Sequence, residues 1–454
     1  MKKVLAEVLG KVKPSNKERK VVKDFYQKVI RAIEKEGYSA AVQGSLAKNT
    51  WISGDHDVDV FVFFPPEVSR GELEKKGLQI GKRVIKKLGG KPEIAFAEHP
   101  YTRTNIGNFT LDIVPCYKLK SAENLKSAVD RTPFHTKFIK SSLDRAQRNE
   151  VRLLKQFMKG IGVYSAKEKV RGFSGYLCEL LILEYGTFGK LIKVAKDWNY
   201  GKVTDILKQY KSASEVKKAF THSLIVIDPT DKNRNVAAAL DGDNFERFVY
   251  ACEEFLKKPS IKFFFPDKPK LFSKDELKKE LANHGEIVLI KFKAPRVVED
   301  ILYSQLRKSL KSLREHLGAE EYEIIDSSIY TNGRSFMVLE FKSMELPNMK
   351  KLAGPPVESD NKFQDAFTKK YRKYKPWVDE GRWYVEVPRE HTDAISMLEH
   401  LMEDPRKIGI GKYCSECILK DYDIIAGDEI IKEYRNGFAE FFTTYLTKKK
   451  PWEW

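Results

Sequence analysis

The stretch that decides the fold is DVDVFVFF, residues 57–64, where two aspartates alternate with valines before apolar side chains take over. A period of two predicts a core strand, and Pro65 and Pro66 end it because proline cannot donate to a sheet. Asp57 and Asp59 project from the same face, about 7 Å apart along the backbone and within bridging reach of one cation. Their charges repel, and a bound metal removes that cost.

Two flanking features extend this pattern toward a nucleotide site. Gly44-Ser45 follows an expected strand at 40–42, and its turn lets backbone N–H groups approach phosphate oxygens without a Cβ in the way. LDIVP, residues 111–115, is a further expected strand and contributes a third carboxylate. Mg²⁺ prefers oxygen ligands, and two such ions activate an attacking 3′-hydroxyl and stabilise leaving pyrophosphate. The predicted catalytic residues, which also bind the metal, are Asp57, Asp59 and Asp112.

The two residues before the strand at 57–64 are interpreted differently. Asp55 has the same parity as the two strand aspartates, but it follows Ser53-Gly54 and is expected in the loop, where aspartate commonly makes a turn. His56 points the other way and has no Cys or His partner at ligand spacing, so a packing or surface role is expected. A DxD on a strand is by itself more often an edge or a solvated face. The nucleotidyltransferase prediction therefore rests on the combination of Gly44-Ser45, the paired aspartates at 57 and 59, and Asp112.

The composition favours a nucleic-acid partner. The chain has 454 residues, with 82 Lys and Arg against 64 Asp and Glu, and a formal net charge of +18. Such a surplus attracts phosphate backbones, although a solvated lysine-rich surface is the alternative. The length exceeds what one core usually supports and predicts three or four domains.

No targeting signal or membrane span is expected. The N-terminus becomes charged soon after MKK, and no segment approaches the roughly 18–20 apolar residues that a bilayer requires. Five cysteines are too few and scattered for a disulfide framework, and chance spacing explains the CxxC of Cys414 and Cys417 better than zinc does. We therefore expect a cytoplasmic protein without a membrane partner.

Hydrophobic periodicity predicts an α+β multidomain protein. Residues 1–150 are expected to form a catalytic nucleotidyltransferase domain with a mixed sheet and helices. Its expected helices and strands include 15–37, 70–88, 93–97 and 109–114. Residues 151–258 carry apolar faces at helical spacing and predict a mainly helical central domain that completes the nucleotide site.

The C-terminal half predicts two smaller α+β regions. Residues 259–354 are the expected body domain, whose strand, helix and two strands joined at Asn332-Gly333 suggest a small sheet with helices on one face. Residues 355–454 are the expected tail. Basic and aromatic side chains at 369–377 can stack on bases and neutralise phosphates, or can equally be the outer face of a helix.

Several motifs resemble those of the polymerase-β nucleotidyltransferase superfamily and, more narrowly, of the class I (archaeal-type) CCA-adding enzymes. The motifs are GSLAKNTW (44–51), DVDVF (57–61), AEHPY (97–101), LDIVPCYK (111–118), SAVDRTPFH (127–135) and RGFSGY (171–176). The first two are shared across the superfamily, and the last two are specific to the family. The family often has Glu at the position of Asp57, which leaves the coordination by this shorter side chain open.

The resemblance implies further site residues. The residues that match the family's nucleotide-binding positions for ATP and CTP are Ser45, Lys48, His135, Lys155 and Tyr164. Arg234, in DPTDKNRN (228–235), matches an arginine that helps to select C or A together with the RNA. Taken alone, Lys155 would be a surface helix residue, Tyr164 a half-buried core ring and Arg234 part of a structural salt bridge.

The resemblance also implies an activity and partners. The expected reaction is template-independent addition of C, C and A to the 3′ end of tRNA from CTP and ATP, with Mg²⁺ as cofactor and pyrophosphate as product. The tail is then expected to bind tRNA, and a homodimer is expected because the family is often dimeric. The alternatives are a poly(A) polymerase or oligoadenylate synthetase, or a non-catalytic RNA-binding protein, and retention of all three aspartates argues against the last.

Overall fold

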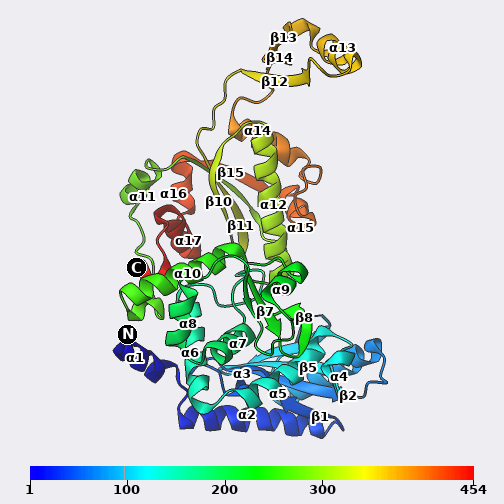
Figure 1. Ribbon diagram of the computed structural model, residues 1–454, viewed down its shortest axis with the longest axis vertical. Helices are drawn as coiled ribbons and strands as arrows, with labels where there is room; N and C mark the ends of the chain where they lie inside the picture. The colour runs from blue at the N-terminus through cyan, green and yellow to red at the C-terminus, as the bar shows by residue number, and fades with distance from the viewer. Residues whose placement is uncertain (97) are drawn as a thin grey trace. The chain divides into compact units, whose positions relative to one another are not determined.

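Residues 1–96 and 98–454 are described in the computed structural model, which divides into two units (Figure 1). The first unit contains Met1–Asp267 together with Lys450–Trp454, and the second contains Lys268–Lys449. Each unit combines helices with sheets, which confirms the α+β multidomain class. No helix within the described ranges is long and apolar enough to span a membrane.

A five-stranded mixed sheet, in the order β1-β2-β5-β4-β3, forms the N-terminal part of the first unit. β2 covers Asp57–Phe64 and ends at the prolines, as predicted, and it pairs in parallel with β5. The other strands, β1 (Ser39–Val42), β3 (Glu93–Phe96), β4 (Pro100–Ile106) and β5 (Phe109–Tyr117), pair antiparallel with their remaining neighbours. The strand predicted at 93–97 is confirmed as far as residue 96, and residue 97 lies outside the described residues.

Two helices, α2 (Asn16–Glu34) and α4 (Arg70–Lys87), cover one face of this sheet. α2 begins where the sequence predicts, because the Ser15 hydroxyl accepts a hydrogen bond from the Glu18 N–H at 3.1 Å. The valines of β2 are buried in one core with both helices. Since side chains alternate along a strand, the aspartates of β2 lie on the opposite face of the sheet.

The rest of the first unit consists mainly of helices, as expected for its central segment. These are α1 (Lys2–Val12), α5 (Thr132–Ser142), α6 (Arg145–Gly160), α7 (Gly175–Tyr185), α8 (Phe188–Ala195), α9 (Ala213–Ala219) and α10 (Gly242–Lys257). The same part of the chain contains a three-stranded sheet that was not predicted from the sequence. Its strands are β6 (Lys202–Thr204), β7 (Leu224–Asp228) and β8 (Asp231–Asn235). The run LIVID at β7 is short and apolar, which suits a buried strand.

The last residues of the chain return to the core of the first unit. Trp452 is 8% exposed, and its ring stacks on Phe263 with 5.1 Å between centroids. The ammonium of Lys262 also donates to a main-chain oxygen of Trp454. Val8 of α1 is buried in the same core, so segments from both ends of the chain complete it.

The second unit contains a four-stranded antiparallel sheet in the order β10-β11-β9-β15. Its strands are β9 (Glu286–Lys293), β10 (Ile324–Asn332), β11 (Arg334–Phe341) and β15 (Tyr422–Ala426). α12 (Glu299–Ala319), α14 (Ala394–Glu403) and α15 (Lys412–Ile418) pack on one face, and α11 (Lys274–Leu281), α16 (Ile430–Glu433) and α17 (Asn436–Thr447) pack on the other.

The expectation of helices on one face of this sheet is therefore wrong. In β9 the side chains of Val288 and Ile290 enter one core, whereas Ile287 and Leu289 enter the other. A strand with a continuous apolar run buries both of its faces and needs a helical layer on each.

A separate three-stranded sheet lies between β11 and α14 in the chain. It has the order β12-β14-β13, with β12 (Met349–Pro356), β13 (Trp377–Asp379) and β14 (Arg382–Pro388), and α13 (Asn361–Lys370) contacts it. Since β15 pairs with β9, the body sheet includes residues from beyond 354. The division into four domains stays a prediction.

Candidate active site

Three aspartates, Asp57, Asp59 and Asp112, form what we call the carboxylate row. They lie on the face of the five-stranded sheet that points away from α2 and α4. Asp59 lies directly opposite Asp112 in the parallel register of β2 and β5, and Asp57 precedes Asp59 by two residues. Asp112 is 9% exposed, Asp59 is half-buried and Asp57 is exposed. Burial and the nearby charges of Asp112 and Asp57 raise the pKa of Asp59 to about 7.

The turn before α3 (Gly44–Lys48) approaches this row closely. Gly44 has φ +64°, and a Cβ at this position would collide with Oδ2 of Asp59. Glycine therefore allows the turn to lie against the carboxylate row. Ser45, the next residue, is half-buried.

An arginine that the sequence analysis did not identify already pairs with one aspartate of the row. Arg103 on β4 lies opposite Asp112 in the antiparallel register with β5. Its Nε donates to Oδ1 of Asp112 at 2.7 Å, and its second terminal nitrogen donates to Oδ2 at 2.6 Å. Only the register of β4 against β5 brings these side chains together, and the sequence does not reveal that register.

The carboxylate row fits a hard divalent cation by its donors. Its oxygens are the ligands that Mg²⁺ prefers. Burial first and the neighbouring carboxylates second raise the pKa of Asp59, and a bound cation would offset both effects. Among the described residues, no three Asp, Glu, His or Cys side chains yet converge as a formed metal cage. Asp112 is held by Arg103, so a metal that used all three aspartates would share Asp112 with this arginine or take its place.

The two predicted phosphate-binding lysines meet at a buried glutamate. The Glu179 cluster consists of Lys48, Thr50, Lys155 and Glu179. Glu179 on α7 is fully buried and accepts from Lys48 at 2.5 Å, from Thr50 at 2.5 Å and from Lys155 at 3.3 Å. Burial alone would raise the pKa of Glu179, but the two lysines outweigh burial and lower it.

Glu179 was not predicted from the sequence, although a signal for it exists. It stands inside the apolar run YLCELLIL, residues 176–183, and a charge at the centre of such a helix needs a buried partner. Tyr164 lies near the same cluster, since the backbone at Gly175 is close to both the Tyr164 hydroxyl and the Lys155 ammonium.

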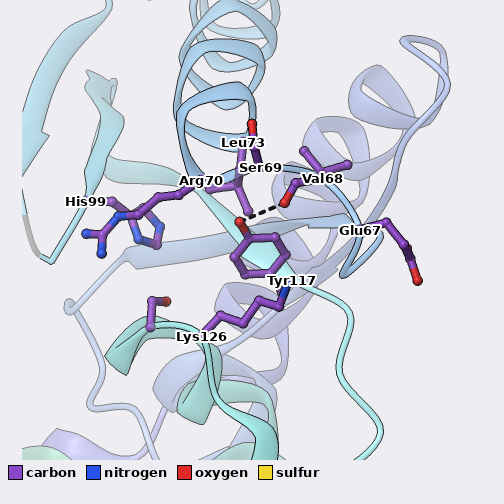
Figure 2. Close-up of a pocket in the computed structure, with 9 residues that line it drawn as sticks. Glu67, Val68, Ser69, Arg70, Leu73, His99, Tyr117 and Lys126 are labelled. Atoms are coloured by element: carbon purple, nitrogen blue, oxygen red, sulfur yellow. Dashed lines mark hydrogen bonds between the residues drawn. The ribbon is translucent and has the colours of Figure 1, made fainter.

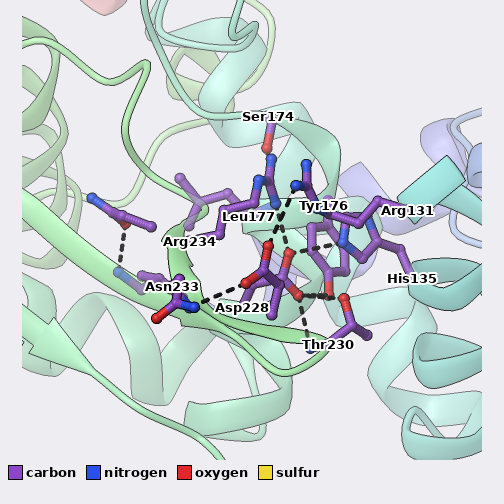
Figure 3. A network of polar contacts seen from close by, with 12 residues as sticks. Arg131, His135, Ser174, Tyr176, Leu177, Asp228, Thr230, Asn233 and Arg234 are labelled. Carbon is purple, nitrogen blue, oxygen red and sulfur yellow. Dashed lines mark hydrogen bonds and ion pairs between the residues drawn. The ribbon is translucent and has the colours of Figure 1, made fainter. Parts of the chain in front are cut away.

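His135 and Arg234 meet at a second buried carboxylate, which Figure 3 shows. The Asp228 cluster consists of His135, Tyr176, Asp228, Thr230 and Arg234. Oδ2 of Asp228 accepts from Nε2 of His135 at 2.8 Å and from Arg234 at 2.7 Å. Oδ1 accepts from the Tyr176 hydroxyl at 3.1 Å and from the N–H and hydroxyl of Thr230 at 2.9 Å.

The electrostatics of the Asp228 cluster are opposite to those of the carboxylate row. The side chain of Asp228 is fully buried, which alone would raise its pKa, but the donors outweigh burial and hold the pKa well below its ordinary value. Burial lowers the pKa of His135. The rings of His135 and Tyr176 stack 4.0 Å apart, and Lys48 of the Glu179 cluster lies 5.6 Å from the Tyr176 ring. The two clusters are therefore neighbours.

Asp55 and His56, the two residues before β2, make structural contacts. Asp55 lies in the loop before β2, as expected, and forms an ion pair with Lys159. His56 bonds Glu18 at 3.0 Å and packs on Phe109, which confirms a packing role.

A small pocket of about 280 Å³ lies elsewhere in the first unit, beside the start of α4 (Figure 2). His99 of the AEHPY motif lines it and donates from Nε2 to the Pro115 carbonyl at 2.8 Å. The Tyr117 hydroxyl donates to the Val68 carbonyl at 3.0 Å, and Lys126 lies over the Tyr117 ring. None of the predicted site residues lines this pocket.

The mixed sheet, the glycine turn and the opposed aspartates define a nucleotidyltransferase of the polymerase-β-like fold. Family models agree: a nucleotidyltransferase domain matches residues 22–135, the second domain of tRNA nucleotidyltransferase matches 149–265, and the C-terminal domain of CCA-adding enzyme matches 284–427. The chain belongs to the CCA-adding enzymes, as the resemblance in its sequence predicted.

Curated relatives match over nearly the full length. A CCA-adding enzyme of Methanosarcina mazei is 39% identical over 97% of this chain and 97% of that protein. One of Archaeoglobus fulgidus is 36% identical over 95% and 96%, and one of Methanocaldococcus jannaschii is 38% identical over 91% and 93%. Membership makes the chain an enzyme, a tRNA nucleotidyltransferase, and indicates dependence on a divalent metal.

Proposed function

We propose that this enzyme adds C, C and A to the 3′ end of tRNA, using CTP and ATP and releasing pyrophosphate without a nucleic-acid template. The observation that carries the proposal is the opposition of Asp59 and Asp112 beside the Gly44 turn. The turn offers backbone donors to a triphosphate, and the aspartates lie next to it. Family membership supports tRNA as the acceptor.

In this proposal Asp57, Asp59 and Asp112 are the catalytic residues and hold Mg²⁺. When bound, the metal would activate the 3′-hydroxyl and stabilise the charge of the leaving pyrophosphate. The protein's own contribution is to fix the three carboxylates by strand register and to bring the Gly44 turn against them. Ser45 then donates to the phosphates, since it follows Gly44, whose backbone lies against Asp59.

We propose that residues of the two buried clusters neutralise the rest of the triphosphate's negative charge and read the base. Lys48, Lys155 and Tyr164 face the phosphates together with His135, and Glu179 holds the lysines in position. Arg234 reads the base, because about a third of its side chain stays exposed while one nitrogen bonds Asp228. A planar guanidinium anchored at one nitrogen still offers donors to a base edge.

The small sheet with α13 is proposed to grip the body of tRNA. Lys369, Lys370, Arg372, Lys373 and Trp377 are exposed there. Deleting all of residues 355–454 would also remove β15 from the body sheet and Trp452 from the first unit. Neutralising the four cations to glutamine is the cleaner test, and it should weaken tRNA binding and flatten its salt dependence. An unchanged salt slope would exclude this surface.

We further propose four domains with the limits and the cytoplasmic location that the sequence analysis predicts, and a homodimer, which the family resemblance implies. Light scattering of the purified chain tests the dimer directly.

The decisive experiment incubates the enzyme and Mg²⁺ with tRNA that lacks CCA and supplies CTP or ATP singly and together. The proposed function predicts CC from CTP alone and CCA from both when the 3′ ends are sequenced. Runs of A from ATP would instead indicate a poly(A) polymerase or oligoadenylate synthetase. Tight tRNA binding without any addition would indicate a non-catalytic RNA-binding protein.

A further inference from the structure

Arg103 is the only cation that bonds an aspartate of the carboxylate row among the hydrogen bonds of the described residues. It bonds both oxygens of Asp112, at 2.7 and 2.6 Å, in a fork-to-carboxylate pair. These are the oxygens that Asp112 would offer to a metal. A carboxylate bonded in this way has no strong acceptor site left on the side facing the guanidinium.

The surroundings allow this pair to open. The side chain of Arg103 is 36% exposed, whereas that of Asp112 is 12% exposed, so the arginine can leave toward solvent while the aspartate stays in place. On its other side, Arg103 lies opposite Glu93 in the register of β3 and β4. Directly opposed side chains on neighbouring strands lie on the same face and within reach of each other. Glu93 is exposed and offers a second acceptor to a released guanidinium.

We propose that Arg103 is a positioning residue that holds Asp112 in the metal-free enzyme and competes with the divalent cation for it. The pair keeps the third carboxylate in place and neutralises it while no metal is bound. Metal binding then requires exchange of Arg103 for the cation. This inference rests on the proposed role of Asp112 as a metal ligand.

Competition of this kind lowers the apparent metal affinity. When only a fraction of the molecules has Asp112 free, the apparent dissociation constant rises by the reciprocal of that fraction. A partly exposed ion pair is modest in strength, so we expect a factor of about three to ten. The effect should depend on the fork as well as on the charge, because a lysine ammonium cannot bond both carboxylate oxygens in parallel.

The test measures binding of Mn²⁺ to the full-length enzyme without nucleotide, by electron paramagnetic resonance of the free ion. Arg103→Gln should bind Mn²⁺ about three- to tenfold more tightly than the unsubstituted enzyme, and Arg103→Lys should show much of this gain although it keeps the charge. Circular dichroism of each variant checks that it is folded. Unchanged affinity in Arg103→Gln, or a gain in Arg103→Gln with none in Arg103→Lys, would overturn the competition by the fork.

Asp112→Asn separates this inference from the proposed metal site. It should weaken Mn²⁺ binding, and adding Arg103→Gln to it should restore nothing, because the contested carboxylate is gone. If Asp112→Asn binds Mn²⁺ as tightly as the unsubstituted enzyme, Asp112 is not a ligand and both proposals fail. If Asp112→Asn loses affinity while Arg103→Gln is unchanged, only the role of Arg103 fails.

Discussion

The carboxylate row and the Asp228 cluster place carboxylates of the same unit in opposite surroundings. Asp228 meets donors from His135, Arg234, Tyr176 and Thr230, and its pKa is held down. Burial, together with the nearby charges of Asp112 and Asp57, raises the pKa of Asp59 to about 7. A buried carboxylate whose charge is balanced by hydrogen-bond donors stabilises the fold. A carboxylate with a raised pKa instead indicates a site where a cation can bind.

The largest expected effect is at the row. Asp59→Asn and Asp112→Asn should each reduce incorporation of C and A by about a thousandfold or more, since the carboxylates serve the reaction. The affinity for tRNA should change little. Single-turnover extension and filter binding measure the two quantities. Substantial residual activity in the Asp112 variant would mean that Asp112 is not a catalytic residue. The functional difference between the carboxylate row and the Asp228 cluster would then not hold.

The next effect is on stability and arises at the Asp228 cluster. Asp228→Asn removes the shared acceptor of His135 and Arg234 and should cost about 3 kcal/mol of unfolding free energy at pH 7, measured by urea denaturation. Because the folded pKa of Asp228 lies below its unfolded value of about 3.9, its contribution is present above that value and is lost as pH falls below it. The difference between variant and parent should therefore shrink as the pH falls below about 4.

A matched substitution nearby serves as the control for this stability prediction. Asp231 pairs with Arg131 at 3.3 Å, but both side chains are partly exposed. Asp231→Asn should cost less than about 1 kcal/mol. Equal losses from the two substitutions would mean that burial does not distinguish them.

The Glu179 cluster sharpens the comparison because it belongs to the scaffold yet adjoins the nucleotide. Glu179→Gln leaves Lys48 and Lys155 buried without their counter-ion and should cost about 2 kcal/mol. If these lysines face the triphosphate, CTP should replace part of the missing charge and raise the melting temperature more in the variant than in the parent. An equal or smaller shift would remove the lysines from the phosphate site.

The smallest expected effect concerns the choice of nucleotide. Arg234→Ala should alter the discrimination between CTP and ATP by about tenfold, because one base-reading contact is worth about 1–3 kcal/mol. Arg131→Ala is the control and should leave discrimination unchanged, since Arg131 pairs with Asp231 outside the Asp228 cluster. Sequencing of extended tRNA ends measures misincorporation. Equal losses for both nucleotides would assign Arg234 to structure alone.

Local patterns predicted much of the fold, because they depend on neighbours in sequence. The alternation in β2, the Ser15 cap of α2 and the Asn332-Gly333 turn between β10 and β11 all lie where periodicity and turn chemistry put them. The β6-β7-β8 sheet and the second helical layer on β9 were missed, since short apolar runs do not reveal what covers them.

The same limit applies to the site. The residues of the carboxylate row are recognisable because two of them share one strand. Arg103, Glu179 and Asp228 acquire their partners only through strand register and helix packing between segments far apart in the chain. The available signal was a charge within an apolar run for Glu179 and a charge at the end of one for Asp228, whereas Arg103 offered none.

The return of Trp452 to the core of the first unit has a consequence for biosynthesis. Domains generally fold from the N-terminus as the chain leaves the ribosome. Here the ring that stacks on Phe263 is synthesised 189 residues later, after the whole second unit. A nascent chain that stops before Trp452 therefore lacks part of the core of its first unit, even when every other residue of that unit has been made.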